Sequence, residues 1–444
     1  MAYAPPEWAG SAYPSLPPQR RERVLLRFGN AWTLNWLHLD MALIALWFIV
    51  TAAQFQYDEL LLYPLALYFT GMFFWRKDVT WPIFQRGALL ILLPCWWMAS
   101  AIWAPDSVHA FRSGLQSLLT ILICMFIAAR LTHRQLLAIV IIAMTVTALR
   151  CLPRSLWDFS VGYPSRGVLA HKNSLGIMMS VSVAAALAVA IAPGVNRLMR
   201  LMALAAVPLS LFLIFASQSA TGILLAVGMC GIILAARVYL GPENNFTLSR
   251  LILAAATLGA ISVAMIFAFN LMQEDPVDLV LAAVGKDRSL TGRTDLWAIG
   301  MEQLAENPYL GVGPGGFWRY QESALVRQIF HDYHLMWRSS FFFHNSWLEI
   351  GVAFGWFGII MAIAATSWTL IVLARRAIKF GSVEDWTFFA IGIGILLRTF
   401  VESDLFAAFV MLHMMFWSAA LMRHRRLPSR YSPSPSVAPL LERN

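Results

Sequence analysis

Charged residues are scarce in this chain of 444 residues, because Asp, Glu, Lys and Arg together make up only 13% of it. A typical soluble domain carries roughly 25% charged residues. Hydrophobic residues make up 59% of the chain, and its mean hydropathy is +0.65. These proportions exclude an ordinary soluble globular protein and indicate a polytopic membrane protein.

Cysteine is also rare, and the four cysteines show no metal-ligand or disulfide spacing. They therefore give no indication of redox chemistry. A secretory signal peptide is not expected, because the polar, Pro-rich segment 1–19 has no positive region before a short apolar run. The net charge of +9 is better explained by Lys and Arg that fix membrane topology than by binding to nucleic acid, so we expect no nucleic-acid partner.

Apolar runs separated by short polar breaks predict an all-α fold, a polytopic membrane bundle of about 12 transmembrane helices. The candidate spans are roughly 35–55, 59–75, 88–103, 113–131, 135–152, 173–192, 198–216, 220–240, 250–270, 346–374, 384–401 and 404–422. Pro94 interrupts the third run and the eleventh is weak, so ten or eleven spans are also compatible with the sequence.

The basic residues between the spans predict the orientation. Arg130, Arg134 and Arg376 are among many that fall on the same face, which the positive-inside rule assigns to the cytoplasm. The predicted organisation is a cytoplasmic tail 1–34, nine helices in 35–270, a large periplasmic loop 271–345, three helices in 346–425 and a disordered cytoplasmic tail 426–444.

The loop 271–345 has no apolar run of the roughly 20 residues that cross a bilayer, yet it is rich in aromatic residues. We expect it to form a partly helical extracytoplasmic cap that carries the chemistry. One helix, capped by Thr291 or Ser289, is predicted to run through about Glu306, with Leu296, either Ile299 or Gly300, and Leu304 on one face. Its first turn contains Arg293, where free N–H groups and a guanidinium favour phosphate.

Three glycines of the loop, Gly311, Gly313 and Gly316, match the pattern GxGxxG. We reject the dinucleotide interpretation because no strand precedes them and no βαβ unit surrounds them. Tight turns and close packing against the membrane domain explain these glycines better.

A second extracytoplasmic segment carries positive charge against the positive-inside bias. Its residues are Arg150, Arg154, Arg166, His171 and Lys172. Charge held there suggests an anionic ligand near the outer headgroup plane. The alternative is that these residues only contact lipid phosphates.

His344 and Asn345 lie where the loop re-enters the membrane. A neutral imidazole at this boundary can accept a proton, although a structural role is the alternative. Further along, Arg398 and Glu402 are four residues apart on one predicted helix face, with Asp404 beyond them. This charge in the membrane predicts either a functional site or an ion pair that braces the bundle.

Four motifs in order resemble the superfamily of O-antigen ligases and Wzy-type polysaccharide polymerases. They are 167–176, 291–297, 307–313 and 344–349, and the resemblance covers about 35–425. The sequence His171-Lys172-Asn173 most resembles the exopolysaccharide polymerase branch. The ligases often show Arg-x3-Leu, whereas Trp297 stands in that leucine position here, which disfavours the ligase branch.

The resemblance implies an inverting, metal-independent glycosyltransferase of the bacterial inner membrane, without a cofactor. It implies a saccharide donor on undecaprenyl diphosphate, which Arg166 and Arg293 would hold, and His344 beside the acceptor hydroxyl. The further candidate contacts to diphosphate or sugar are Lys172, His171, Asn173, Arg154 and Asn345. The expected partners are membrane lipid and polysaccharide assembly proteins such as a chain-length regulator.

Physical chemistry supports the same site. A diphosphate leaving group needs a divalent metal or Arg and Lys side chains, and no Asp-x-Asp occurs on the outside loops. Two other classes remain open: a transporter or flippase, although the halves show no obvious repeat, and a non-catalytic scaffold.

Overall fold

The structure is a computed structural model that describes residues 24–28, 32–53, 55–240, 293–337 and 339–422. The predicted ninth span, the start of the predicted periplasmic loop and the predicted C-terminal tail lie outside the described residues. The site is therefore built from the remaining helices and from the cap after residue 293.

The only strands among the described residues form a short antiparallel hairpin, β1 (Val24–Phe28) and β2 (Trp32–Asn35). Both are rich in aromatic and aliphatic residues, and the sequence between them contains Gly29-Asn30, a pair that favours turns. The hairpin falls in the segment 1–34 that was predicted as a tail. The predicted all-α class is otherwise confirmed in the described residues, with this hairpin as the exception.

Seven helices of the described part are long and apolar enough to cross a membrane, which makes this a multi-pass membrane protein. They are α1 (Trp36–Ala53), α5 (Ser107–Arg130), α6 (His133–Ser160), α7 (Lys172–Ile191), α8 (Arg197–Ser217), α9 (Ala220–Tyr239) and α14 (Ser346–Phe380). An eighth is obtained if α3 (Lys77–Gly87) and α4 (Leu89–Ala99), which meet at a bend of 80°, count as one broken span.

Three of the predicted spans are occupied by shorter helices. These are α2 (Glu59–Trp75), α15 (Val383–Arg398) and α16 (Met411–Leu421). The predicted span 404–422 is thus only partly helical, because α16 begins seven residues later than expected. The predicted count of about 12 membrane helices exceeds the number found in the described residues.

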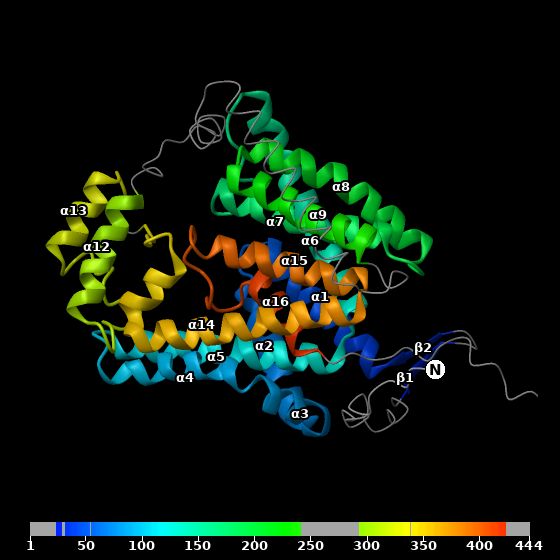
Figure 1. Ribbon diagram of the computed structural model, residues 1–444, viewed down its shortest axis with the longest axis horizontal. Helices are drawn as coiled ribbons and strands as arrows, with labels where there is room; N and C mark the ends of the chain where they lie inside the picture. The colour runs from blue at the N-terminus through cyan, green and yellow to red at the C-terminus, as the bar shows by residue number, and fades with distance from the viewer. Residues whose placement is uncertain (1–23, 29–31, 54, 241–292, 338, 423–444) are drawn as a thin grey trace, which may run out of the picture.

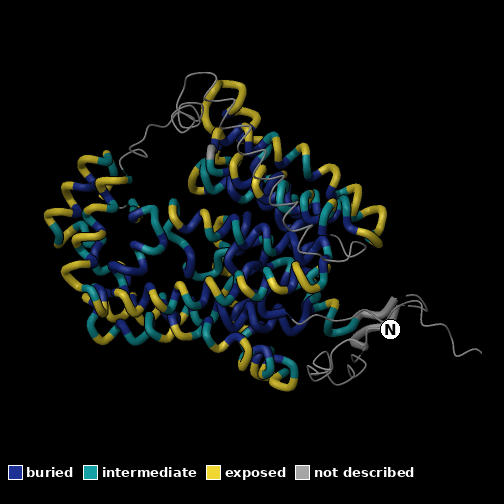
Figure 2. Tube along the Cα trace, viewed as in Figure 1, coloured by how far each residue is buried: buried dark blue, intermediate teal, exposed yellow. Residues whose placement is uncertain are grey.

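The core of the bundle lies around α5, α6, α7 and α16. Every residue of α16 is buried, as expected for a helix that is apolar on all sides. Figure 2 shows this buried centre, while exposed residues follow the outer helices such as α8. Exposed apolar side chains on an outer helix of a membrane protein face lipid rather than water.

Basic residues gather at one end of the bundle. The Arg134 Nε donates to Glu384 at 2.9 Å, and its Nη2 donates to the Pro193 carbonyl at 2.5 Å. Arg376 approaches the His133 ring at 3.0 Å. The predicted gathering of these arginines on one face is consistent with these contacts, and the assignment of that face to the cytoplasm stays a prediction.

The other end carries the cap helices α12 (Arg293–Glu306) and α13 (Ala324–Asp332), which lie side by side beyond the membrane helices (Figure 1). On α12 the buried residues are Leu296, Gly300 and Leu304. The predicted helix, with its apolar face, is therefore confirmed. The buried face packs against the beginning of α14, where the side chain of Leu348 lies close to Gly300.

The cap is joined to α14 at a break in that helix. Gly355 has φ +65° and ψ −165°, which interrupts the helical backbone. The segment 308–313 fills the break: the N–H groups of Val312 and Gly313 donate to the carbonyls of Val352 and Ala353 at 2.9 and 2.8 Å. Gly311 has φ +66° and lies against the backbone of Ala353, so the packing interpretation of this glycine is supported.

Candidate active site

Arg293 is the first residue of α12 and lies where the cap meets the membrane bundle. Its Nη1 donates to the carbonyl of Val401 at 3.0 Å. Val401 belongs to the connection between α15 and α16, residues 399–410. An arginine has five N–H donors, so this contact leaves most of the guanidinium available to an anion.

His344 lies beside the same connection. Its Nδ1 lies 3.9 Å from a carboxylate oxygen of Glu402, and its side chain is 32% exposed. The backbone of His344 has φ +53°, an uncommon conformation for a residue other than glycine. The ring of Phe341 lies edge-on to the imidazole with centroids 5.7 Å apart.

A half-buried carboxylate, that of Glu349, fixes the backbone before His344. Glu349 accepts hydrogen bonds from the N–H of Phe343 and from the indole N–H of Trp318, each at 2.9 Å. Glu349 lies in the first turn of α14, whereas Trp318 belongs to the cap. This contact therefore positions His344 with respect to both the membrane helix and the cap.

Asn345, a predicted contact to substrate, is the N-cap of α14. Its side-chain oxygen accepts from the N–H groups of Trp347 and Leu348 at 3.0 and 3.2 Å. Its own N–H donates to the Ser403 hydroxyl at 2.9 Å. These contacts are structural. The side chain caps the first turn of α14, and the backbone N–H attaches this point of the chain to the 399–410 connection.

Three consecutive residues of that connection, Val401, Glu402 and Ser403, thus contact Arg293, His344 and Asn345 respectively. The structure brings these three predicted residues together on one short segment.

Arg398 departs from the prediction. α15 ends at Arg398, so Glu402 is not on the same helix face, and the side-chain ion pair is formed with Asp404 at 2.5 Å instead. The His413 Nε2 lies 3.7 Å from the same carboxylate. This ion pair braces the 399–410 connection. Of the two predicted roles, the structure therefore shows the bracing ion pair, with Asp404 in place of Glu402 as the partner of Arg398.

The second group of predicted residues lies between α6 and α7. Its core is a buried network in which the Ser165 hydroxyl donates to Asp158 at 3.0 Å and lies 2.9 Å from the Ser155 hydroxyl. Arg154 forms an ion pair with Asp158 at 2.8 Å. The network fixes the loop that carries Arg166, whose exposed side chain makes one long contact, to the Ala170 carbonyl at 3.5 Å.

The residues His171, Lys172 and Asn173 begin α7. His171 is exposed and occupies the N-cap position without a side-chain cap hydrogen bond. The Asn173 side chain accepts from the Ser219 hydroxyl at 3.2 Å, which ties α7 to the start of α9. Arg150 turns away from this group, since its guanidinium lies 3.8 Å over the ring of Phe55.

Among the described residues, no recorded contact joins Arg166 to Arg293 or His344. The link between the two groups is indirect: Arg398 at the end of α15 and Ile177 near the start of α7 line one small cavity. The described part of the chain also holds no cluster of three or more His, Cys, Asp or Glu side chains arranged as metal ligands. Independence from metal stays a prediction.

Tyr333 of the cap packs on Phe341, with ring centroids 5.2 Å apart. Burial, followed by the negative charges of Asp295 and Asp332, raises the pKa of its phenol above the ordinary value. The shift moves this phenol further from ionisation, so Tyr333 is not a candidate base.

Sequence reasoning missed Glu402 as a partner of His344, and it missed the roles of Glu349 and Trp318. Glu349 lies within the predicted motif 344–349, so its spacing from His344 was visible. Nothing in the sequence indicated that Glu402, on a distant connection, would face the imidazole.

Comparison with known proteins agrees with the sequence motifs. A family model described as O-antigen ligase matches residues 204–363, a range that includes Arg293 and His344. The chain is also similar to the exopolysaccharide production protein ExoQ of Rhizobium meliloti (strain 1021). The two are 29% identical over 311 residues, which cover 68% of this chain and 69% of that protein. The predicted resemblance is confirmed: residues 204–363 of this multi-pass helical membrane protein match the O-antigen ligase family model.

Proposed function

We propose that this protein is a glycosyltransferase of the bacterial inner membrane that polymerises repeat units carried on undecaprenyl diphosphate into exopolysaccharide on the periplasmic side. The observation that carries the proposal is that Arg293 and His344 contact two consecutive residues, Val401 and Glu402. A cation suited to a diphosphate and a group able to take a proton therefore lie at one short segment.

The reaction is an inverting transfer. The acceptor hydroxyl oxygen forms a bond to the anomeric carbon of the donor, and the bond from that carbon to the diphosphate oxygen breaks. The hydroxyl proton passes to His344, and the electron pair leaves with undecaprenyl diphosphate. Glu402 faces Nδ1, so the tautomer with the proton on Nδ1 leaves Nε2 free as the acceptor of the hydroxyl proton.

Charge on the leaving diphosphate is stabilised by arginine. Arg293 uses one guanidinium nitrogen for the Val401 carbonyl and keeps the others for phosphate oxygens. Arg166 is held on a rigid loop with an exposed side chain, and it supplies the second guanidinium. The exposed His171 and the half-buried Lys172, at the start of α7, add positive charge around the same anion.

The second candidate is an O-antigen ligase that transfers the finished polysaccharide to lipid A-core. The description of the matching family model favours it. The name of the similar Rhizobium protein and the sequence His171-Lys172-Asn173 favour the polymerase.

The lipid-linked intermediates of a strain lacking this protein separate the two candidates. A polymerase defect leaves single repeat units on the lipid carrier, whereas a ligase defect leaves long chains on it. A strain that accumulates neither and makes normal polymer and lipopolysaccharide contradicts both.

A further inference from the structure

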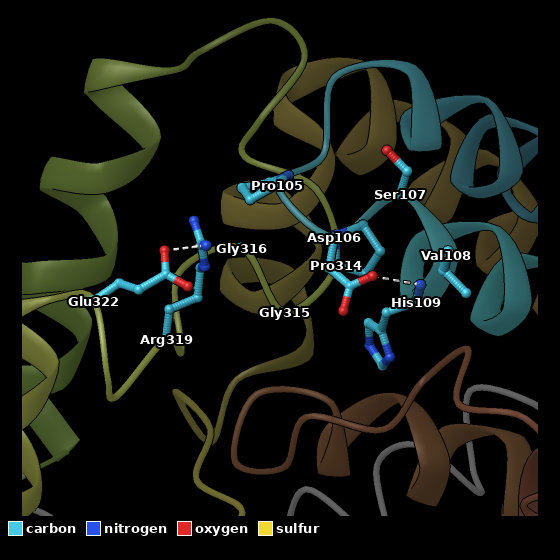
Figure 3. Close-up of a pocket in the computed structure, with 10 residues that line it drawn as sticks. All are labelled: Pro105, Asp106, Ser107, Val108, His109, Pro314, Gly315, Gly316, Arg319 and Glu322. Carbon is cyan, nitrogen blue, oxygen red and sulfur yellow. Dashed lines mark hydrogen bonds and ion pairs between the residues drawn. The ribbon is translucent and has the colours of Figure 1, made fainter.

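A half-open pocket of about 630 Å³ lies between the connection from α4 to α5 and the cap. Its lining residues are Pro105, Asp106, Ser107, Val108, His109, Pro314, Gly315, Gly316, Arg319 and Glu322 (Figure 3). The volume falls within the range of roughly 300–1,000 Å³ that is usual for small-ligand sites. None of these residues belongs to the candidate active site.

The two walls of the pocket are fixed to one another by contacts outside it. The indole N–H of Trp103 donates to the Leu310 carbonyl at 3.2 Å, and Ala104 packs directly against Gly313. The pocket is therefore formed by the fold itself and needs no ligand to assemble it.

The chemistry of the lining suits an uncharged sugar. Arg319 and Glu322 form an ion pair across one side, and the Asp106 carboxylate accepts from the His109 backbone N–H at 2.8 Å (Figure 3). Each carboxylate has further lone pairs to accept from hydroxyl groups, and the guanidinium has further donors. Pro105, Val108 and Pro314 supply apolar surface for the C–H faces of sugar rings.

The same charges disfavour a diphosphate. Asp106 and Glu322 place two carboxylates beside a single arginine, so a doubly charged anion would meet net repulsion. The pocket thus differs in charge from the site around Arg293, where the proposed ligand is a diphosphate.

The pocket is also connected to the candidate active site. It lies at the beginning of α5, and two turns further on this helix holds the 399–410 connection. There the Ser117 hydroxyl donates to the Phe406 carbonyl at 3.3 Å, and the Phe409 N–H donates to the Thr120 hydroxyl at 3.1 Å. The cap wall continues directly from the segment 308–313 that fills the break in α14.

We infer that this pocket is a subsite for an uncharged saccharide segment of the substrate, away from the reacting bond. The inference rests on the proposed function. The saccharide belongs either to the acceptor chain or to the donor repeat unit. Blocking the pocket weakens binding of the acceptor in the first case and of the donor in the second.

The test uses the full chain, purified in lipid nanodiscs, and lipid-free oligosaccharides obtained by partial hydrolysis of the polymer made by the host strain. Ser107→Trp fills the pocket from an exposed position, and His109→Ala removes a ring whose backbone contacts remain. Glu306→Ala is the control, because this exposed carboxylate of the cap helix α12 accepts only a hydrogen bond from Gln303 among the described residues and does not line the pocket.

We expect calorimetry to show oligosaccharide binding to the native protein and to Glu306→Ala, weakened roughly tenfold or more in both pocket variants. In turnover assays kcat should be kept while one KM rises. A higher acceptor KM assigns the pocket to the growing chain, and a higher donor KM assigns it to the incoming repeat unit.

Binding and both KM values that are unchanged in a folded Ser107→Trp protein would overturn the subsite, as would native protein that binds no oligosaccharide. Should Ser107→Trp fail to fold, His109→Ala decides in the same way. A protein that binds oligosaccharide through the pocket but transfers no sugar would instead contradict the proposed function and leave the subsite standing.

Discussion

The imidazole Nδ1 of His344 and the carboxylate of Glu402 lie 3.9 Å apart, although one belongs to the end of the cap and the other to the connection after α15. This distance is longer than a hydrogen bond, so the carboxylate faces the imidazole without being bonded to it. Under the proposed function, His344 is the base and Glu402 is the group that orients it.

The first prediction concerns the role of His344. General-base catalysis contributes typically ~10²–10⁴-fold, so His344→Ala should lose turnover by about that factor while donor binding is kept. His344→Gln should be equally impaired, because an amide can orient a hydroxyl but cannot take its proton. Turnover is measured with purified protein and lipid-linked donor; near-native activity of His344→Gln would reduce the residue to positioning.

Glu402→Gln provides the second prediction. It keeps the size and hydrogen-bonding capacity of the side chain but removes its charge, so turnover should fall less than in His344→Ala. Combining both substitutions should cost no more than His344→Ala alone, because Glu402 acts through the histidine. Additive losses in the double variant would argue against the pairing.

The third prediction concerns Arg166 and Arg293, the proposed contacts to the diphosphate. Arg166→Ala and Arg293→Ala should each abolish or severely reduce polymer without loss of protein from the membrane. Arg293→Lys should restore only part of the activity, since an ammonium cannot form the bidentate contact to phosphate. Arg154→Ala is the matched comparison: its side chain is engaged by Asp158, so polymer should be largely retained. Full activity of Arg293→Lys would show that the bidentate contact of the guanidinium to phosphate is not needed.

Topology gives a fourth prediction. In a variant without native cysteines, Gln321→Cys in the cap should react with a membrane-impermeant thiol reagent added from the periplasm. Arg197→Cys, at the start of α8 and exposed, should react only after the membrane is opened. Protection of position 321 in intact cells would place the site on the wrong side for periplasmic polymerisation.

A fifth prediction concerns stability. Gly311→Ala introduces a side chain at φ +66° and brings its Cβ to 2.4 Å from the Ala353 backbone, so the melting temperature should fall. Backbone strain alone costs of order 1–3 kcal/mol. Gly231→Ala, with no atom within 4 Å of the new methyl group, should melt like the native protein. Equal melting temperatures for the two variants would remove the packing explanation for Gly311.

The parts of the fold that could be predicted from the sequence are those with local signals. Hydropathy located the long spans. The spacing of Leu296 and Leu304 predicted the buried face of α12, where the structure selects Gly300 over Ile299 as the residue between them. Arg293 at a helix start and His344 before a membrane helix were recognised in the same way, from neighbours in sequence.

Long-range pairing could not be predicted. Arg398 was matched with Glu402 because they are four residues apart, but α15 ends at Arg398, and the chain then turns so that Asp404 reaches the guanidinium and Glu402 reaches His344. The N-cap role of Asn345 and the ion pair of Arg154 with Asp158 were likewise not predicted, because the sequence does not show which groups these side chains meet in the fold. The predicted contacts of both residues to substrate stay predictions.

The break in α14 has a mechanical consequence. At Gly355 the membrane helix gives up its regular backbone pairing, and the cap segment 308–313 supplies the missing partners, including the Pro308 carbonyl that accepts from the Trp356 N–H at 2.7 Å. The cap cannot swing away from α14 without unpairing these buried groups, each at a penalty of about 1–3 kcal/mol. This junction therefore holds the cap firmly on α14 and does not act as a hinge. Under the proposed function, we expect any opening that admits a lipid-linked substrate to lie elsewhere on the cap.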